Sequence, residues 1–137
     1  LMLCRMLRRG NYLSSSAIYD LHGVCSSVYY DNCVEYVAQK LNKPHLYVFA
    51  DDKIWARNNL KFKLKTTFVD HNDASLDYED LRLMSQCKHQ IIANSTFSWW
   101  AAWLNENPNK IVLAPKNWFN KSENNTNDLI PEHWVRI

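Results

Sequence analysis

Five mostly apolar runs punctuate the chain, and each ends at a turn or a polar residue. They are Leu1–Leu7, Leu46–Ala50, Thr66–Val69, Gln90–Ala93 and Lys110–Ala114. Runs of this length and composition predict buried β-strands. Because a sheet face open to water would show polar side chains at alternate positions, uninterrupted apolar strands indicate a sheet that is covered on both faces.

Helical spacing fills the segments between these runs. Ser26 or Ser27 opens the clearest helix, and Asn42–Pro44 ends it. The other three segments are a short stretch with Ile54, Trp55 and Leu60, a helix capped by Asp77, and a helix Phe97–Asn105 capped by Ser95 or Thr96. Strands that alternate with helices predict an α/β fold, a doubly wound parallel sheet. Asn120–Asn127 is expected to be a surface loop, with Trp134–Ile137 docking after it.

The composition suits one ordinary globular domain. The chain has 137 residues, a net charge of +2 and 22% charged residues, which does not suit a strongly basic nucleic-acid binder. Its longest apolar run, Trp99 to Leu104, is far shorter than the ~20 residues of a membrane span. With two glycines the chain cannot contain G-x-G-x-x-G or G-x-x-x-x-G-K-[ST]. Any phosphate must therefore be bound in another way.

The cysteines carry a prediction about the compartment. Cys4, Cys25, Cys33 and Cys87 form no C-x-x-C pair, so we expect free thiols, a reducing environment and a cytoplasmic location. Their spacing matches no metal framework, and no metal is expected. The chain begins at Leu1 inside an apolar run, which predicts a piece of a longer protein.

Polar residues follow every predicted strand, at the edge where open parallel sheets bind ligands. In strand order they are Arg8, Arg9 and Gly10; Asp51 and Asp52; Asp70; Asn94, Ser95 and Thr96; and Pro115 and Lys116. Cations, carboxylates and hydroxyls are therefore expected along one rim of the domain.

An anion site is expected where Asn94–Thr96 open the aromatic helix. Backbone N–H groups, the Ser95 and Thr96 hydroxyls and the helix dipole can bind a phosphate without glycine. The segment alone favours a plain N-cap over a core helix, and the arginine pair shifts the preference to an anion site. Three tryptophans of that helix are expected in the core: Trp99, Trp100 and Trp103.

Arginine and aspartate pairs complete the candidate site. A guanidinium binds phosphate bidentately, so one of Arg8 and Arg9 is expected to clamp the anion. Asp51 and Asp52 could bind a divalent metal, accept hydrogen bonds from a base such as guanine, or cap the next helix.

Five longer motifs follow one another along the chain. They are Arg8-Arg9-Gly10-Asn11-Tyr12, Phe49-Ala50-Asp51-Asp52 followed by Trp55, Leu83–His89, Asn94–Leu104 and Ala114–Phe119. In this order they resemble the α-1,2-fucosyltransferases of glycosyltransferase family 11. The resemblance runs from about Arg8 to Phe119 and is carried most strongly by the long aromatic motif.

That resemblance implies a galactoside 2-α-L-fucosyltransferase. Such an enzyme moves L-fucose from GDP-fucose to the 2-hydroxyl of a galactose-type acceptor in glycan synthesis, with inversion and without a metal. It implies a two-lobed GT-B fold, of which residues 1–137 would be the Rossmann-like, nucleotide-sugar-binding lobe, the N-terminal acceptor lobe being missing. The family also leaves open a peripheral association of the full-length enzyme with a membrane.

The same resemblance implies the roles of individual residues. Arg8 is the implied catalytic residue, because it would meet the charge that builds on the β-phosphate as GDP leaves. The implied donor-binding residues are Arg8, Arg9, Gly10, Asp51, Asp52, Asn94, Ser95, Thr96 and Phe97.

Two departures from the family pattern favour an alternative function. The family motif reads His-x-Arg-Arg-Gly-Asp-Tyr, whereas Met6 stands at the histidine position and Asn11 at the aspartate position. A lobe that binds a GDP-sugar without catalysis is therefore the first alternative. The second, less favoured, is a phosphoacceptor receiver domain, whose residue types would be matched by Asp51, Asp52, Asp70, Thr96 and Lys116.

Overall fold

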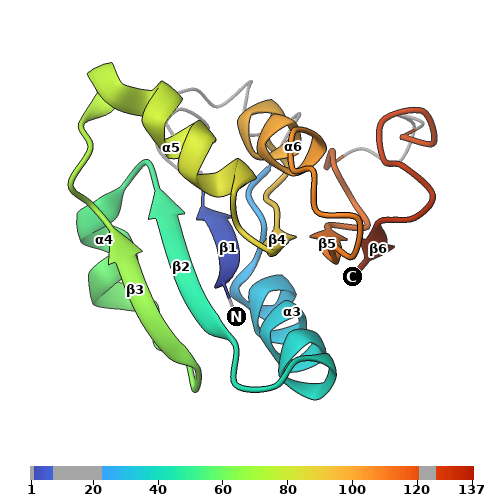
Figure 1. Cartoon of the computed structure of the whole chain (residues 1–137), viewed down its shortest axis with the longest axis horizontal. Coiled ribbons are helices and arrows are strands. Elements are labelled where there is room, and N and C mark those ends of the chain that lie inside the picture. The colour runs from blue at the N-terminus through green and yellow to red at the C-terminus, as the bar shows by residue number, and fades with distance from the viewer. Residues whose placement is uncertain (1, 8–22, 121–125) are drawn as a thin grey trace.

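One parallel sheet organises the domain (Figure 1). The computed structural model describes residues 2–7, 23–120 and 126–137, and for residues 2–7 it describes the backbone. The described strands are β1 Met2–Leu7, β2 His45–Ala50, β3 Lys65–Val69, β4 His89–Ile91, β5 Val112–Ala114 and β6 Val135–Arg136. They form a sheet in the order β3-β2-β1-β4-β5-β6.

All strand pairs run parallel, so the carboxyl ends of the strands share one edge of the sheet. β1 pairs with β2 over its whole length, from Met2 opposite His45 to Leu7 opposite Ala50. From β1 the chain builds outward to β3 on one side, and it returns to β4 on the other side. The direction of building therefore reverses between β1 and β4, and open parallel sheets bind their ligands at such a point.

Helices cover both faces of the sheet. They are α3 Ser27–Lys40, α4 Lys53–Asn59, α5 Asp77–Ser85 and α6 Thr96–Trp103, with a 3-10 turn η1 at Ala74–Leu76. Two of them begin at a side-chain cap. The Ser26 hydroxyl accepts from the Tyr29 N–H at 3.1 Å, and the Asp52 carboxylate accepts from the Trp55 N–H at 2.9 Å. Each cap satisfies a helix-start donor that would otherwise lack an acceptor.

The core is split by the sheet into two layers. On one face α3 and α4 pack on Val48, Ile91 and Leu113. On the other face α5 and α6 pack on Phe49, next to a third cluster that joins α6 to Val112 and the C-terminal segment. Successive strand residues point to opposite faces, so the neighbours Val48 and Phe49 serve different layers.

These observations confirm the predicted α/β architecture with a parallel sheet. They add a sixth strand, Val135–Arg136, where only docking of the C-terminal segment was expected. Asp77 was wrongly expected to cap its helix: Leu76 occupies the N-cap position of α5, and Asp77 lies in the first turn. A capping carboxylate lies four residues upstream instead. The Asp73 carboxylate accepts from the Ser75 N–H and caps the start of η1.

The aromatic helix also differs from expectation. Trp100 and Trp103 were expected in the core, but they are 51% and 52% exposed. From Trp99 to Trp103 every residue of the helix is apolar, so the pattern does not distinguish the face that meets the sheet from the face that meets solvent. The small residues Ala101 and Ala102 take the fully buried positions instead.

Two global properties complete the description. Within the described residues, no helix is long and apolar enough to cross a membrane. The three cysteines whose side chains are described, Cys25, Cys33 and Cys87, form no disulfide. Residues 121–125 of the expected surface loop lie outside the described part of the chain.

Candidate functional site

The connection from β4 to α6 lies at the carboxyl edge of the sheet, beside β1. Ile92 to Ser95 are all buried, and the exposed Thr96 begins α6 directly afterwards. The buried Ser98 hydroxyl lies 3.0 Å from the Ala93 carbonyl and 2.9 Å from the Ser95 carbonyl. This hydroxyl thereby links the first turn of α6 to the connection from β4.

The start of α6 is not capped by its own N-cap residue. Ser95 occupies that position but makes no side-chain cap hydrogen bond, unlike Ser26 of α3 and Asp52 of α4. The first intrahelical bond runs from the Trp99 N–H to the Ser95 carbonyl at 3.0 Å. A helix start without a capping side chain can receive an anion through its backbone N–H groups and the positive end of its dipole.

Asn94 has a structural task at this edge. Its side-chain amide donates to the carbonyls of Gly23 at 3.3 Å and Trp118 at 3.2 Å, and its oxygen accepts from the Cys25 thiol at 3.4 Å. These bonds tie the end of β4 to the segment before α3 and to the segment after β5. Both amide hydrogens are used in this way, so Asn94 has a structural role at the rim. Its expected donor-binding role stays a prediction.

Gly23 is required where this tie is made. Its φ is +62°, a conformation that costs an L-residue with a side chain, and a Cβ there would lie 2.2 Å from Asn120 Oδ1. One of the two glycines thus allows the loop before α3 to approach the loop after β5.

A small cavity of about 210 Å³ opens beside this tie. Its wall combines the start of α3 with the ends of β4 and β5 and includes Ser26, Tyr29, Asn94 and Asn117. The Tyr29 hydroxyl donates to the Ile92 carbonyl at 2.7 Å, and burial is the largest cause that raises the Tyr29 pKa well above its ordinary value. Tyr29 therefore stays protonated, and its hydroxyl links α3 to the residue after β4 at the wall of the cavity.

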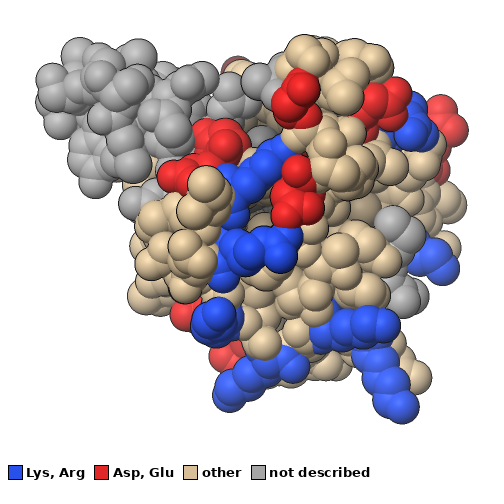
Figure 2. Space-filling view, turned by 90° about the vertical axis from the view of Figure 1, so that its left-hand side faces the viewer, with Lys and Arg blue, Asp and Glu red and all other residues tan. Residues whose placement is uncertain are grey.

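The aspartates after β2 and β3 already have local partners. Asp52 caps α4, and the Asp51 carboxylate accepts from the Asp52 N–H at 2.8 Å. Asp70, at the end of β3, forms an ion pair with Arg57 of α4. Figure 2 looks at this side of the molecule and shows acidic and basic side chains next to one another in its upper part, with mainly basic side chains below. Both Asp51 and Asp52 are exposed, so each keeps carboxylate surface for a ligand.

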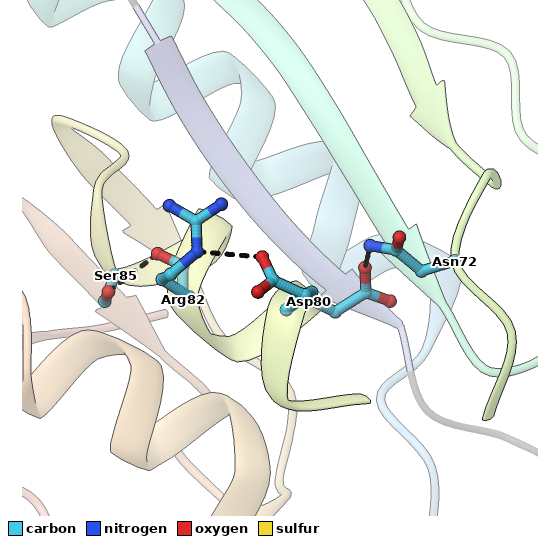
Figure 3. A network of polar contacts seen from close by, with 5 residues as sticks. Asn72, Asp80, Arg82 and Ser85 are labelled. Carbon is cyan, nitrogen blue, oxygen red and sulfur yellow. Dashed lines mark hydrogen bonds and ion pairs between the residues drawn. The ribbon is translucent and has the colours of Figure 1, made fainter. Parts of the chain in front are cut away.

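The loop after β3 is anchored by a polar network (Figure 3). The Asn72 amide donates to the Asp80 carboxylate at 2.7 Å, and the Lys53 ammonium donates to the Asn72 carbonyl. On the same helix, Arg82 donates to Glu79 at 2.8 Å. Lys53 belongs to α4 and Asp80 to α5, so the loops after β2 and β3 are held to each other.

The structure therefore divides the predicted site residues into three groups. Asn94, Ser95, Thr96 and Phe97 come together at the start of α6, although the Phe97 ring packs into the core between α5 and α6. Asp51 and Asp52 lie at the end of β2, with β1 between them and β4. Arg8, Arg9 and Gly10 lie outside the described residues.

Sequence reasoning missed three positions that shape this edge. Ser98, Gly23 and Cys25 act through side-chain or backbone contacts across 5 to 71 positions of sequence. Only Gly23 left a signal, as one of two glycines in the chain. Among the described residues, no group of three or more side chains could hold a metal ion, and the metal-free expectation stays a prediction.

Relatives of the chain were found among characterised proteins. It is 38% identical to an alpha-1,2-colitosyltransferase of Escherichia coli, over 96% of this chain and 46% of that protein. It is 36% identical to the O-antigen biosynthesis glycosyltransferase WbnK of Escherichia coli, over 96% of this chain and 43% of that protein. A galactoside alpha-(1,2)-fucosyltransferase 1 of Leontopithecus chrysomelas is 28% identical, over 72% and 27% of the two chains.

The chain spans less than half the length of these relatives. A comparison with protein families finds a match over nearly every position of the chain. The profile of glycosyl transferase family 11 aligns with residues 2–137, from the first described strand to the C-terminal residue. The chain belongs to glycosyl transferase family 11.

Proposed function

We propose that this chain is the nucleotide-sugar-binding lobe of an α-1,2-fucosyltransferase, with GDP-fucose as donor and the 2-hydroxyl of a galactose-type glycan as acceptor. One observation carries the proposal. In this member of glycosyl transferase family 11, the uncapped start of α6 lies between β1 and β4, the point of the sheet where the strand order changes direction. That position is where an open parallel sheet binds a nucleotide.

The strand order supports a Rossmann-like lobe of a GT-B enzyme. The order β3-β2-β1-β4-β5-β6 is the arrangement of dinucleotide-binding sheets, which bind the diphosphate at a helix start beside the first strand. In this chain the first described helix after β1 is α3, and the uncapped start is that of α6, which follows the neighbouring strand β4. We propose that the backbone N–H groups of α6 bind the diphosphate in place of a glycine motif. Arg8 and Arg9 follow Leu7, the last residue of β1, which is the neighbour of β4.

The proposed reaction needs little from this lobe beyond charge stabilisation. The acceptor oxygen attacks the anomeric carbon from the face opposite to GDP, the C–O bond to the β-phosphate breaks, and the hydroxyl proton leaves to a base outside this proposal. Negative charge then grows on the β-phosphate. Arg8 and the start of α6 would stabilise it, so that the chemistry proceeds without a metal. Asp51 and Asp52 would accept hydrogen bonds from guanine or ribose.

A second donor is favoured by a specific observation. The relative named as an alpha-1,2-colitosyltransferase is 38% identical to this chain, against 28% for the galactoside alpha-(1,2)-fucosyltransferase. The linkage is the same in both names, so the two candidates differ in the sugar and not in the proposed site. A donor competition assay with the two nucleotide sugars separates them.

Calorimetric titration of the chain tests the donor site. We expect GDP and GDP-fucose to bind, ADP to bind much more weakly, and magnesium to change neither affinity. Arg8→Ala should weaken GDP binding by a factor that corresponds to about 1.5 to 3 kcal/mol, the worth of a charge-assisted phosphate contact. Arg82→Ala, on the exposed side of α5, is the matched control and should leave GDP affinity unchanged.

The non-catalytic alternative makes a different prediction. If Met6 and Asn11 abolish turnover, GDP-fucose binds but the full-length protein transfers no fucose to galactose-containing acceptors. Asn11→Asp would then be expected to restore transfer in part. Failure of a folded sample to bind GDP at all contradicts the proposed donor site itself.

A further inference from the structure

A second cavity lies at the opposite edge of the sheet, where β4 and β5 begin. Its volume is about 750 Å³, within the range of small-molecule sites. Two turns form its wall, the one from α5 to β4 and the one from α6 to β5, with Gln86, Lys88, His89, Asn105, Glu106 and Asn109. From His89 to Asn94 the chain advances roughly 15 Å at the rise of a strand. This cavity is therefore separate from the donor edge, the carboxyl edge of the sheet beside β1 where the nucleotide sugar is proposed to bind.

Several polar side chains in the wall of this cavity are held by hydrogen bonds. His89 is only 7% exposed, and its Nδ1 accepts from the Ile111 N–H at 3.0 Å. That bond leaves the ring proton on Nε2, a donor on a residue that lines the cavity. Burial, and then the neighbouring Lys88, lower the pKa of His89, so the ring is neutral near pH 7 and keeps this arrangement.

Asparagine side chains fix the two turns against each other. Asn105 is buried, its amide donates to the Cys87 carbonyl, and its oxygen accepts from the Asn107 N–H at 2.8 Å. The Asn107 amide then donates to the Lys88 carbonyl at 2.8 Å. The wall is therefore held without a ligand, while Gln86, Glu106 and Asn109 remain exposed on it.

The cavity wall begins one residue after an exposed tryptophan of α6. Leu104 lines the cavity and is exposed, and Trp103 precedes it at the end of α6. The Trp103 ring stacks on Trp99 with centroids 5.1 Å apart and planes 10° apart. Trp99 is fixed in turn, because its Nε1–H donates to the Leu129 carbonyl at 2.7 Å. Trp103 is therefore held by Trp99 while it keeps about half of its surface, 52%, in solvent, next in sequence to a residue of the cavity wall.

We propose that this cavity and the Trp100–Trp103–Leu104 surface bind a neutral oligosaccharide. Amide and carboxylate side chains pair with sugar hydroxyls, and an exposed indole face packs on the apolar C–H face of a pyranose ring. The charged wall residues, Lys88 and Glu106, have opposite signs, which favours a ligand without net charge. The site would hold a part of a glycan away from the donor edge, and it stands independently of which nucleotide sugar the donor edge takes.

The test uses saturation-transfer NMR and tryptophan fluorescence titration of the chain, with lactose and longer galactose-containing oligosaccharides as probes. We expect saturation transfer to the galactose ring protons. Trp103→Ala should weaken binding about tenfold, the loss of one well-stacked ring, while Trp103→Phe should recover most of it. Glu106→Ala should weaken binding as well. Tyr78→Ala, an aromatic residue 62% exposed at the far end of α5, is the matched control.

Each outcome decides the proposal. Binding that falls in Trp103→Ala and Glu106→Ala but not in Tyr78→Ala supports it. Absence of saturation transfer to a folded chain, or equal affinity in all variants, overturns it. Self-association measured by sedimentation that disappears in Trp103→Ala, without oligosaccharide binding, also overturns it and assigns the surface to a protein interface. GDP titration of the same variants keeps this result apart from the donor site, since none of them alters the start of α6.

Discussion

Asn94→Ala tests whether the donor edge is organised by a structural tie. The substitution removes two donors, to the Gly23 and Trp118 carbonyls at 3.3 and 3.2 Å, and one acceptor, for the Cys25 thiol. Asn94 is 3% exposed, so water does not readily replace these partners. The tie holds three segments that are far apart in sequence, and its loss should lower the free energy of unfolding.

The magnitude follows from the geometry. Both amide bonds lie at the long end of the normal range, so each contributes toward the lower end of about 0.5 to 1.5 kcal/mol. Two such bonds, with two buried carbonyls left without a donor, give a loss of about 2 kcal/mol. With a urea m-value of about 2 kcal/mol/M, the unfolding midpoint should fall by about 1 M.

Asn94→Asp sharpens the same test. The carboxylate has nearly the same shape but offers no donor, so two carbonyl oxygens face a negative charge, and at pH 7 this variant should be less stable than Asn94→Ala. The carbonyls would raise the pKa of the new carboxyl in the folded state. A group whose folded pKa is raised binds protons more readily when folded. Its penalty is therefore largest above that pKa and diminishes as the pH falls toward about 3.9.

Urea unfolding followed by circular dichroism, at a series of pH values, measures these differences. Asn42→Asp, in the exposed turn after α3, is the charge control and should change stability by less than about 0.5 kcal/mol. The structural role of Asn94 is contradicted if Asn94→Ala unfolds at the same urea concentration as the wild type while GDP binding is lost. That result would make Asn94 a ligand of the donor rather than a tie.

Three further predictions concern single contacts. Asp52→Ala should cost about 1 kcal/mol of stability through the lost cap of α4, whereas Asp52→Asn should keep the cap; thermal melts compare them, and equal losses would contradict the capping role. Lys110→Met should cost about 1 to 3 kcal/mol, because the ammonium donates to the Ala102 and Asn105 carbonyls at 2.7 Å, and faster amide exchange in the last turn of α6 should accompany it. The lowered pKa of His89 predicts stability that is present above about pH 6.5 and is lost as the pH falls through the folded pKa; His89→Asn should flatten that slope, and an unchanged slope would assign it to other groups.

The fold was predictable because one signal runs through it. Apolar runs such as Leu46–Ala50 and the helical spacing before Asn42 each report burial along one element, and burial on both faces implies the parallel sheet. The features that were not predicted depend on contacts between elements. The two residues of β6 are too short to carry a pattern, and they form a strand only because β5 offers an edge. The exposed side of α6 was not predictable because all its residues from Trp99 to Trp103 are apolar.

The candidate site was predictable to a smaller extent. Ligands bind at the carboxyl ends of parallel strands, and this rule alone predicted that Asn94–Thr96 lie at that edge of the sheet, where the structure has them beside β1. Which of the predicted site residues make structural contacts was not predictable. Asn94 turns its amide to two loops that approach only in the folded chain, and Asp52 turns to its own helix. Side chains of one type can serve a ligand or the backbone, and only the positions of distant carbonyls decide which.

The two proposed sites share α6, and its anchoring predicts that they act independently. The helix begins at the donor edge and ends, after about 12 Å, at the second cavity. Ser98 fixes its start to the Ala93 and Ser95 carbonyls, and Lys110 fixes its end. A ligand shifts another site only when it favours one of two arrangements of the protein. We expect the contacts at both ends of α6 to keep this helix in one arrangement when either ligand binds. GDP affinity should therefore be the same with and without saturating oligosaccharide. A changed affinity would mean that α6 moves, and then Ser98→Ala, which loosens its start, should alter the coupling more than Tyr78→Ala does.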